Sequence, residues 1–538
     1  MNRSGIVPLA IGVLCLGLLF PPNSQQAFGQ EVEQPEATLI ICPSAFDEAL
    51  RPWLELRKSQ GFNLIVQRPQ PTAYGITRQV RDTAKNHRLD HVVLIGDAFN
   101  ATEPQNAIPA DYVRATVNVQ FGSEPEIATD QTYADLDGDG LPEFPVGRIC
   151  ADTPEQLSQV VQKIIDYETS EDFGTWRRRI DLIAGTGGFG QVIDKVIEMA
   201  SKRMITDLIP HDYETSVTYG SWTSPYCPDP RRFSQTTIES LNRGGLFWIY
   251  AGHGHPLRLD RMQVPGGEFP IFEIGDEEKL DCQSGNPIGV MLSCYTGAFD
   301  FQRDCVAEKM VNQSGGPVAM ICGTRVTMPY AMSLLTLEMM QDFFEQDEPT
   351  TLGQLFNRAQ RRMVSGENEG DYRRVIEVLG KTFSPTKELL EDELKEHVYL
   401  FHIIGDPLLT LRKPGKVELS VAEELTNGQT TQVQGTSTIP GKLIIELAYQ
   451  RDRMRFRPKR RKEFLVDHEA FMEYHETYQQ ANNRICDRQE LVIPAGDFSI
   501  ELNVPEEASG ECVIRAYVAG SDGYSIGSAP VMVKKIRR

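Results

Sequence analysis

The chain has 538 residues, with 54 basic and 75 acidic side chains and a formal net charge of −21. At about 150 residues per domain, this length predicts two to four domains. Because a strongly acidic surface repels a phosphate backbone, we expect no nucleic-acid partner.

Residues 1–29 have the pattern of a secretory signal peptide. Arg3 precedes an apolar stretch over 6–20, and a polar segment then ends in Ala27-Phe28-Gly29, a small-x-small cleavage site. An uncleaved N-terminal anchor is the alternative, although the stretch is short for a membrane span. No later run is long and apolar enough to cross a bilayer. We therefore expect a mature protein without an integral membrane span, located in the periplasm, outside the cell or at its surface.

Residues 30–175 alternate between strand and helix patterns. The apolar runs TLIIC (38–42), NLIVQ (63–67) and HVVLIGD (91–97) are separated by amphipathic runs, one through Trp53 and one from Thr77. Such alternation is typical of a parallel sheet with helices on its faces. It predicts an N-terminal α/β subdomain.

The loop DLDGDGLPE in this subdomain has the spacing of a calcium-binding loop. Asp135, Asp137 and Asp139 alternate with other residues, and the glycines between and after them allow a tight turn. The bidentate glutamate expected at the twelfth position is missing, because Val146 stands there, so a complete calcium-binding helix pair is excluded. A structural calcium ion and an ordinary acidic turn remain as the two interpretations.

Residues 176–412 carry a second alternating series. It begins at Ile180 and continues with a helix over 192–208, a strand over 216–220 and a helix over 232–242. Two further buried strands, a helix around 306–311 and the strand PVAMICGT (317–324) follow, with helices to about residue 400. The break between the two series near 168–176 predicts two α/β subdomains.

Two strands of this second series end at reactive side chains. LFWIYAGHGHP leads to His253, and PIGVMLSCYT leads to Cys294. In open α/β sheets the chemistry lies just beyond the carboxyl ends of the strands. A nearby imidazole lowers the pKa of a thiol and later protonates a leaving amine, so the pair fits a nucleophile and its base. The amides of Gly254 and Cys294 are candidate donors to an oxyanion.

Residues 413–538 change in character. Alternating segments such as KVELSV, KLIIELAY, FSIELNV and CVIRAYVAG are separated by turn residues, which predicts a separate antiparallel β-sandwich. The basic block RDRMRFRPKRRK (451–462) is interpreted as a solvated hairpin insertion, with an anionic contact surface or a processing site as alternatives.

The chain has ten cysteines, and nine remain after removal of residues 1–29. An odd number in an oxidising compartment leaves one thiol unpaired, and Cys294 fits that description. Cys486 and Cys512 lie in strand-like segments and are a candidate disulfide. Cys42, Cys150 and Cys322 interrupt buried runs and are expected to act as small apolar residues.

Beyond the pair itself, several segments resemble the gingipain family of caspase-like cysteine peptidases. YAGHGHP is similar to the family's histidine block, and LSCYTGAFDFQRDCVAEKMV to its cysteine block. GGPVAMICGTR, DGLPEFPVGRI and LFHIIGDPLLTL resemble three other family segments, so the similarity spans roughly 37–411. The resemblance implies a caspase-like catalytic unit of two subdomains, followed by an immunoglobulin-like sandwich.

The resemblance also implies roles. His253 would be the general base and acid, Cys294 the nucleophile and Gly254 an oxyanion donor, acting on a protein or peptide substrate without a catalytic cofactor. Arginine-specific members of the family have an acidic residue in a loop that reads AGTGGFGQVID here, with Thr186 at the nearest equivalent position. Asp194 is the acid nearby. The preference for Arg, Lys or an uncharged residue therefore stays open.

Two other classes of function stay open. His255 alternates with His253, so these histidines with Asp260, Cys282 or Cys294 could form the zinc site of a hydrolase. His255 could instead line the substrate cleft. A catalytically silent binding or adhesion protein, acting through the sandwich and its basic block, is the other alternative.

Overall fold

The computed structural model describes residues 35–99, 103–187, 208–367 and 370–535. The expected signal peptide, most of the expected helix over 192–208, and Asp194 lie outside these residues. Among the described residues, no helix is both long and apolar enough to span a bilayer.

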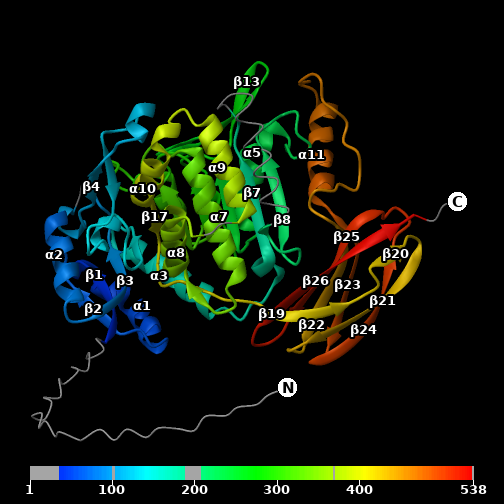
Figure 1. Ribbon diagram of the computed structural model, residues 1–538, viewed down its shortest axis with the longest axis horizontal. Helices are drawn as coiled ribbons and strands as arrows, with labels where there is room; N and C mark the ends of the chain where they lie inside the picture. The colour runs from blue at the N-terminus through cyan, green and yellow to red at the C-terminus, as the bar shows by residue number, and fades with distance from the viewer. Residues whose placement is uncertain (1–34, 100–102, 188–207, 368–369, 536–538) are drawn as a thin grey trace, which may run out of the picture.

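A mixed sheet of ten strands forms the centre of the molecule (Figure 1). Its spatial order is β2-β1-β3-β6-β17-β15-β14-β9-β7-β8. The strands are β1 (Glu36–Ile41), β2 (Leu64–Gln67), β3 (Arg88–Ile95), β6 (Val146–Ile149), β7 (Arg179–Ala184), β8 (Glu214–Tyr219), β9 (Phe247–Ala251), β14 (Ile288–Leu292), β15 (Ala319–Gly323) and β17 (Phe401–Ile404). Both α/β series of the sequence thus contribute strands to one continuous sheet.

The expectation of a purely parallel sheet is wrong where the two series meet. Strand β17 runs parallel to β6 but antiparallel to β15, with Gly323 opposite Phe401. The sequence pattern could not show this reversal, because a strand buried on both faces is a continuous apolar run in either direction.

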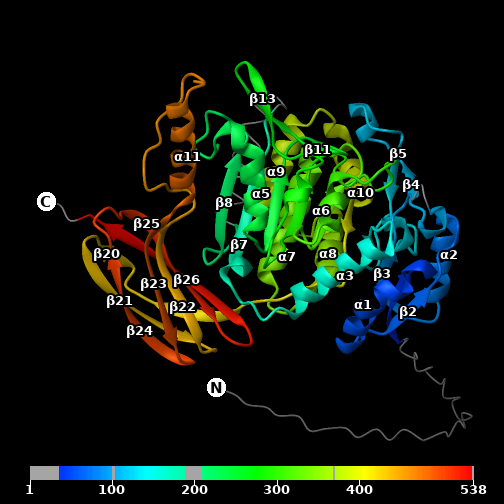
Figure 2. The same cartoon turned by 180° about the vertical axis from the view of Figure 1, so that it is seen from behind.

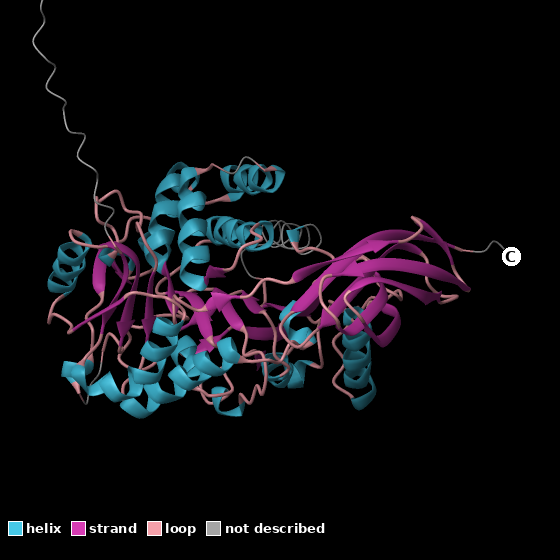
Figure 3. Ribbon diagram, turned by 90° about the horizontal axis from the view of Figure 1, so that it is seen from below, coloured by secondary structure: helices cyan, strands magenta, loops and turns pink. Residues whose placement is uncertain are grey.

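Helices cover both faces of the sheet (Figure 3). One group of contacting helices is α1 (Asp47–Ser59), α3 (Pro154–Thr169) and α6 (Val306–Asn312). A second group is α7 (Pro329–Glu345), α8 (Leu352–Ser365), α9 (Asp371–Phe383) and α10 (Leu390–Leu400). Two more helices, α2 (Ala73–Ala84) and α5 (Phe233–Asn242), accompany the outer strands.

Local side-chain chemistry sets the helix ends. The expected helix at Thr77 begins earlier, at Ala73, because the Thr72 side chain accepts a hydrogen bond from the amide of Gly75 and caps the first turn. Helix α8 has a Thr351–Gln354 capping box at its start, and Gly366 ends it with a left-handed φ of 69°.

A buried arginine joins helices α1 and α3 to the loop after β17. Arg57 is fully buried, and its guanidinium binds Glu168 at 2.7 Å and also Asp406. The Trp53 indole donates a further hydrogen bond to Asp406 at 2.5 Å. The two carboxylates compensate the buried charge, which would otherwise be strongly destabilising.

The C-terminal part is all-β except for one helix. Its strands are β19 (Gly415–Ser420), β20 (Glu424–Thr426), β21 (Gln429–Ser437), β22 (Gly441–Tyr449), β23 (Ile485–Ile493), β24 (Gly496–Val504), β25 (Gly510–Ala519) and β26 (Tyr524–Lys534). They pair in the order β23-β22-β25-β26-β19-β21-β24, with β20 beside β26 and a separate apolar core. Cys486 and Cys512, the candidate disulfide, are both free thiols in this structure, and the neighbouring Cys512 lowers the pKa of Cys486.

The insertion between β22 and β23 differs from the expected solvated hairpin. It contains helix α11 (His468–Asn482), and it lies against the β8 side of the catalytic unit (Figure 2). Arg451 is buried, and its guanidinium donates to the backbone carbonyls of Ile209, Pro210 and Tyr213. The basic block therefore contributes to an internal interface, which its charge alone did not reveal.

A buried ion cluster connects the β-rich C-terminal part to the α/β part. Glu446 of β22 is fully buried and binds Arg178, which precedes β7, at 2.9 Å. Arg515 and Arg488 bind the same carboxylate at 2.6 and 3.2 Å. Nearby, the Tyr517 hydroxyl donates to the carbonyls of Phe173 and Gly174.

We predict that Glu446→Ala destabilises the protein by about 3–5 kcal/mol, because it leaves the Arg178 charge buried without its partner. The measurement is chemical denaturation of the purified protein. Glu424→Ala is the matched control, since Glu424 pairs with Lys534 at the exposed surface and such pairs contribute about 0–1 kcal/mol. If the two variants lowered the free energy of unfolding equally, Glu446 would not be the partner that compensates the buried charge of Arg178.

Candidate active site

Strands β9 and β14 are adjacent and parallel, and they align the two candidate catalytic residues. Ala251 is opposite Leu292, so His253 and Cys294 each lie two residues beyond the end of a strand, at one edge of the sheet. The amide of Gly252 donates to the Leu292 carbonyl at 3.3 Å, which continues the pairing into the loops. The register thus places the backbones of these two residues just beyond neighbouring strand ends.

The backbone after Cys294 has an unusual conformation. Tyr295 has a φ of 59°, the sole positive φ outside glycine among the described residues. Such a conformation is costly for a residue with a side chain, so its surroundings must hold it. The amide of Tyr295 donates to the Arg325 carbonyl at 3.1 Å, and the Tyr295 hydroxyl donates to Glu124 at 2.7 Å.

The Cys294 thiol is half-buried and has hydrogen-bond donors around it. The amide of Thr327, in the loop after β15, lies 3.3 Å from Cys294 Sγ, and the Thr327 hydroxyl lies 3.7 Å from it. The thiol in turn lies 3.8 Å from the Thr327 carbonyl oxygen, so the backbone and side chain of Thr327 together hold the sulfur in place. Sequence reasoning missed Thr327, because no local pattern links it to a cysteine 33 positions earlier.

The loop of His253 packs directly on the loop of Cys294. Gly254 is essential there, because a Cβ at this position would lie 2.4 Å from the Cys294 carbonyl oxygen and 2.9 Å from Ser293 Cβ. The Tyr250 hydroxyl donates to the His253 carbonyl at 2.7 Å. His253 itself is exposed, as a group that must reach a substrate needs to be.

His255 lies on the short strand β10 (Gly254–His255), which pairs with β11 (Arg258–Leu259). Its side chain is exposed at the surface, and partial desolvation by its surroundings together with the charge of Arg258 lowers its pKa. In the described part of the chain, no group of three or more metal-ligand atoms within 4.8 Å includes His253 or His255. The zinc interpretation therefore has no geometric support in these residues.

A segment of the N-terminal half reaches this edge of the sheet. It is the hairpin of β4 (Asp111–Arg114) and β5 (Glu126–Thr129). The Arg325 guanidinium donates to the Glu126 carbonyl and binds Asp300 at 2.5 Å, so the hairpin lies against the loops after β14 and β15. The sequence contained no signal for this long-range contact.

The acidic loop gathers four carboxylates. Oxygens of Asp135, Asp137, Asp139 and Glu143 lie within 4.8 Å of one another. Asp135 accepts hydrogen bonds from two loop amides, and Glu143 accepts one from Leu136 at 2.6 Å. Glu143, the last residue of this loop, is thus a fourth carboxylate beside the three aspartates.

A second set of potential metal ligands is buried near α6. Asp97, Cys150 and Glu308 have ligand atoms within 4.8 Å of one another. Asp97, Asp152 and Asp304 form a second group whose ligand atoms are equally close. Burial raises the pKa of Glu308 to about 7. Sequence reasoning missed this set, because its members come from distant segments.

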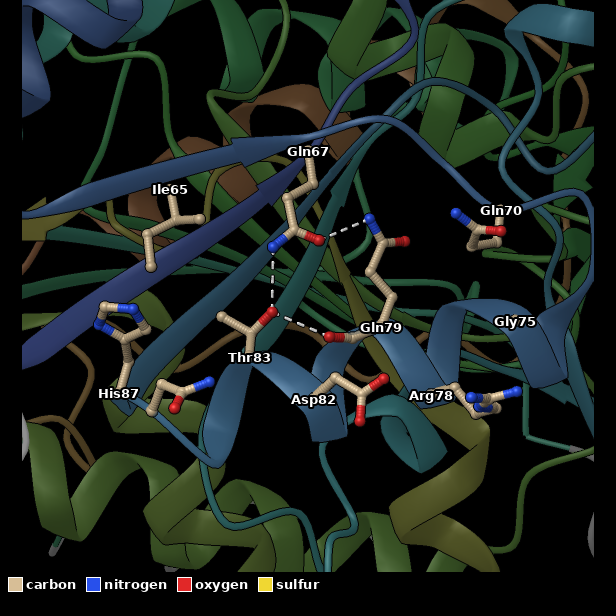
Figure 4. A pocket seen from close by; sticks show the side chains of 10 residues that line it. Ile65, Gln67, Gln70, Gly75, Arg78, Gln79, Asp82, Thr83 and His87 are labelled. Carbon is tan, nitrogen blue, oxygen red and sulfur yellow. Dashed lines mark hydrogen bonds between the residues drawn. The ribbon is translucent and has the colours of Figure 1, made fainter.

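A large hollow lies away from these loops, over β2 and α2 (Figure 4). It has a volume of about 560 Å³ and is lined by polar side chains. Gln67, Gln79 and Thr83 hydrogen-bond to one another at 2.7 to 3.0 Å. The hollow contains no cysteine, so the chemistry favours the edge at His253 and Cys294 instead.

Comparisons with known proteins agree with this site. The pattern of peptidase family C25 matches residues 31–412. Lys-gingipain W83 of Porphyromonas gingivalis is 28% identical over 294 residues, which are 54% of this chain and 15% of the relative. Lys-gingipain HG66 of the same organism is 24% identical over 294 residues, 54% of this chain and 16% of the relative. The matches thus cover less than a fifth of each relative's length.

Solved structures show the same fold. The Arg-specific cysteine proteinase gingipain R aligns with a TM-score of 0.53 at 16% identity, over 94% of this chain and 99% of that chain. A complex of the pro- and mature domains of a Porphyromonas gingivalis gingipain aligns with a TM-score of 0.51 at 16% identity, over 93% of this chain and 100% of that chain. The α/β unit therefore has the caspase-like peptidase fold, and the chain belongs to peptidase family C25, a family of cysteine-type endopeptidases that includes the gingipains.

Proposed function

We propose that this protein is a cysteine endopeptidase that hydrolyses peptide bonds with Cys294 as nucleophile and His253 as general base and acid. The observation that supports the proposal is the in-register pairing of β9 and β14, because both residues follow neighbouring strand ends at one edge of the sheet. Membership of family C25 supports the same reaction class.

In this mechanism the Cys294 sulfur attacks the carbonyl carbon of the scissile bond, and a C–S bond forms. The imidazolium of His253 gives its proton to the departing amine as the C–N bond breaks, leaving a thioester. His253 then accepts a proton from water, whose oxygen attacks the thioester. The C–S bond then breaks and releases the acid product, and the proton on His253 returns to the sulfur, which restores the thiol and the imidazole.

Two backbone amides are suited to the oxyanion that forms during both attacks. We assign this role to Gly254 and Cys294, whose loops are in contact. Preorganised donors of this kind contribute about 3–4 kcal/mol to transition-state stabilisation. Thr327 complements them, since its donors face the sulfur rather than the substrate.

The substrate pocket is the least determined part of the proposal. Asp194 is our candidate for a carboxylate that selects a basic side chain, and His255 for a residue lining the cleft, where its exposure suits contact with substrate. A buried guanidinium or ammonium without a partner would cost several kcal/mol, so basic specificity requires such a carboxylate.

The remaining proposals concern context. We propose that residues 1–29 are a signal peptide, that 30–175 and 176–412 form the two catalytic subdomains, and that 413–538 are an immunoglobulin-like sandwich. The protein would then be secreted, periplasmic or on the cell surface and act on proteins or peptides. The net charge of −21 argues against a nucleic-acid partner.

We also propose a structural calcium ion at the acidic loop, held by Asp135, Asp137, Asp139 and Glu143. The close approach of their oxygens supports it. Burial and the neighbouring Asp137 and Asp135 charges raise the pKa of Glu143. A cation would offset this repulsion, and because its ligands must be ionised, binding should weaken as the pH falls toward the raised pKa of Glu143.

We predict that Cys294→Ala and His253→Ala each lower kcat/KM for a peptide substrate by roughly 10⁴-fold or more, with little change in thermal unfolding. His255→Ala should keep substantial activity. An inactive His255→Ala together with an active His253→Ala would show that the wrong histidine was chosen.

Iodoacetamide should label Cys294 at neutral pH, whereas Cys282 and Cys305 are buried.

We predict that Gly254→Ala lowers kcat/KM about 100-fold, because its Cβ would collide with the Cys294 carbonyl and displace one loop by about an ångström. The measurement is steady-state kinetics with circular dichroism as a check on folding. Gly267→Ala is the matched control, since a Cβ there meets no atom within 4 Å. Full activity of Gly254→Ala would contradict the proposed packing of the two loops.

We predict that calcium raises the thermal unfolding temperature of protein stripped with EDTA, and that Asp137→Asn reduces this increase. The measurement is differential scanning calorimetry with and without calcium. Asp347→Asn is the control, because Asp347 is exposed and pairs with Lys416 away from the loop. Equal calcium responses of all three proteins would rule out the acidic loop as the site.

A further inference from the structure

Asp260 lies behind the catalytic loops, between β11 and β12 (Arg261–Val264). Its Oδ2 accepts a hydrogen bond from the amide of Thr186 at 3.0 Å, and its Oδ1 accepts one from the amide of Arg261 at 2.7 Å. Two backbone donors thus hold the carboxylate in one orientation. Each oxygen keeps a lone pair for another donor.

The backbone of Asp260 is linked to the backbone of His253 through Tyr250. The Tyr250 hydroxyl accepts a hydrogen bond from the Asp260 amide at 3.2 Å while it donates to the His253 carbonyl at 2.7 Å. Tyr250 is fully buried, so this bridge is rigid. It fixes the loop of Asp260 relative to the loop of His253.

Close packing brings the carboxylate next to the base of the histidine loop. A Cβ added at Gly185 would lie 3.2 Å from Asp260 Oδ2 and 3.3 Å from Gly252 Cα. The same Cβ would lie 2.8 Å from the Tyr250 hydroxyl, so Gly185 allows Asp260, Tyr250 and Gly252 to pack closely together. A side chain at position 185 would disturb this packing.

The charges around Asp260 are consistent with this arrangement. The pKa of Asp260 is raised, chiefly by burial and also by the charge of Glu268. The two backbone hydrogen bonds and the charge of His253 lower the same pKa and so offset part of this rise. The Arg261 guanidinium forms ion pairs with Glu268 at 2.6 Å and with Glu273 at 2.9 Å. His253 is thus the cationic side chain that acts on Asp260 in this environment.

We propose that Asp260 is a positioning residue for the catalytic reaction, which orients the imidazole of His253 and stabilises its protonated form. The inference rests on the proposed function of the His253–Cys294 pair. Asp260 does not contact the substrate or exchange a proton. Its negative charge favours the imidazolium, and with it the thiolate of Cys294, in the resting enzyme.

The position of Asp260 in the chain explains why sequence patterns do not reveal this role. It lies seven residues after His253, within a segment whose two short strands fold back on themselves. Its carboxylate binds the amide of Thr186, in the loop after β7, so a residue from one loop supplies a negative charge to another.

The test compares Asp260→Asn with Asp260→Glu, and Glu268→Gln serves as matched control because it removes the other carboxylate charge that acts on Asp260. Steady-state kinetics are measured on paired peptides that end in Arg and in Ala. The pH dependence of Cys294 alkylation by iodoacetamide reports the thiolate–imidazolium pair. Thermal unfolding reports structural damage.

We expect Asp260→Asn to lower kcat roughly tenfold or more on both peptides, with KM changed by no more than about twofold. In the alkylation profile, the ionisation that belongs to the imidazolium should move to lower pH by about one unit, because the charge that favours the protonated ring is lost. Asp260→Glu should keep that ionisation near its wild-type pH, even if kcat falls. Glu268→Gln should match the wild type.

The proposal is overturned by a wild-type kcat and alkylation profile in Asp260→Asn. Equal pH shifts in Asp260→Asn and Asp260→Glu overturn it as well, since they would mark Asp260 as a structural link only. A loss confined to the Arg peptide would make Asp260 a specificity residue instead. If Asp260→Asn does not fold, a displaced ionisation in Asp260→Glu decides against the proposal.

These outcomes are separate from a failure of the proposed function. An inactive wild type, or an active Cys294→Ala variant, would refute the catalytic pair itself. An active wild type, an inactive Cys294→Ala variant and a normal Asp260→Asn variant would refute only the role of Asp260.

Discussion

The pairing of β9 with β14 is the constraint on which the candidate site depends. Parallel strands are about 4.8 Å apart, so two residues at equal distances beyond paired positions are held as neighbours by the backbone itself. Ala251 opposite Leu292 fixes that register, and a shift of one residue would turn every side chain of the strand to the other face. Burial of both strands on both faces makes such a shift prohibitive.

The loops beyond these strands convert backbone proximity into a chemical arrangement. Gly254 lets the histidine loop rest on the Cys294 carbonyl, and the positive φ of Tyr295 turns the chain sharply after Cys294. The strain at Tyr295 is held by hydrogen bonds to Arg325 and Glu124, which come from different parts of the chain. Reactive geometry is therefore maintained by contacts outside the two loops.

The antiparallel junction of β15 and β17 has the same consequence on a larger scale. It joins the two halves into one sheet, and the Arg57 cluster with Glu168 and Asp406 locks the loop that follows β17. The hairpin of β4 and β5 can then reach from the N-terminal half to the loop of Asp300 and Arg325. A two-part catalytic unit thus behaves as one packed body around its active edge.

The C-terminal part protects the opposite end of the sheet. Strand β8 is an edge strand, whose free backbone groups invite unwanted pairing. The Asn482 side chain of α11 binds both the amide and the carbonyl of Val217 at 2.8 and 2.9 Å, and Tyr478 hydrogen-bonds to Thr218. The insertion that contains the basic block and α11 therefore covers the β8 edge of the sheet. Its positive charge alone did not predict this structural role.

The amino-acid sequence by itself determined most of the elements and the reactive pair. Continuous apolar runs marked β9, β14 and β15, and the residues at their ends identified His253 and Cys294 as candidates, because buried strands and their ends have local signatures. The alternating pattern after residue 413 likewise indicated the β-rich C-terminal part, although it missed helix α11.

Only the tertiary structure decided which distant residues meet. The reversal at β17, the donors of Thr327 and the carboxylate of Asp260 depend on contacts between segments that no periodicity connects. Local sequence specifies strands, helices and reactive groups, because these depend on near neighbours. The orientation of a catalytic base depends on packing across the whole fold, and this is why it emerges only when the chain is assembled.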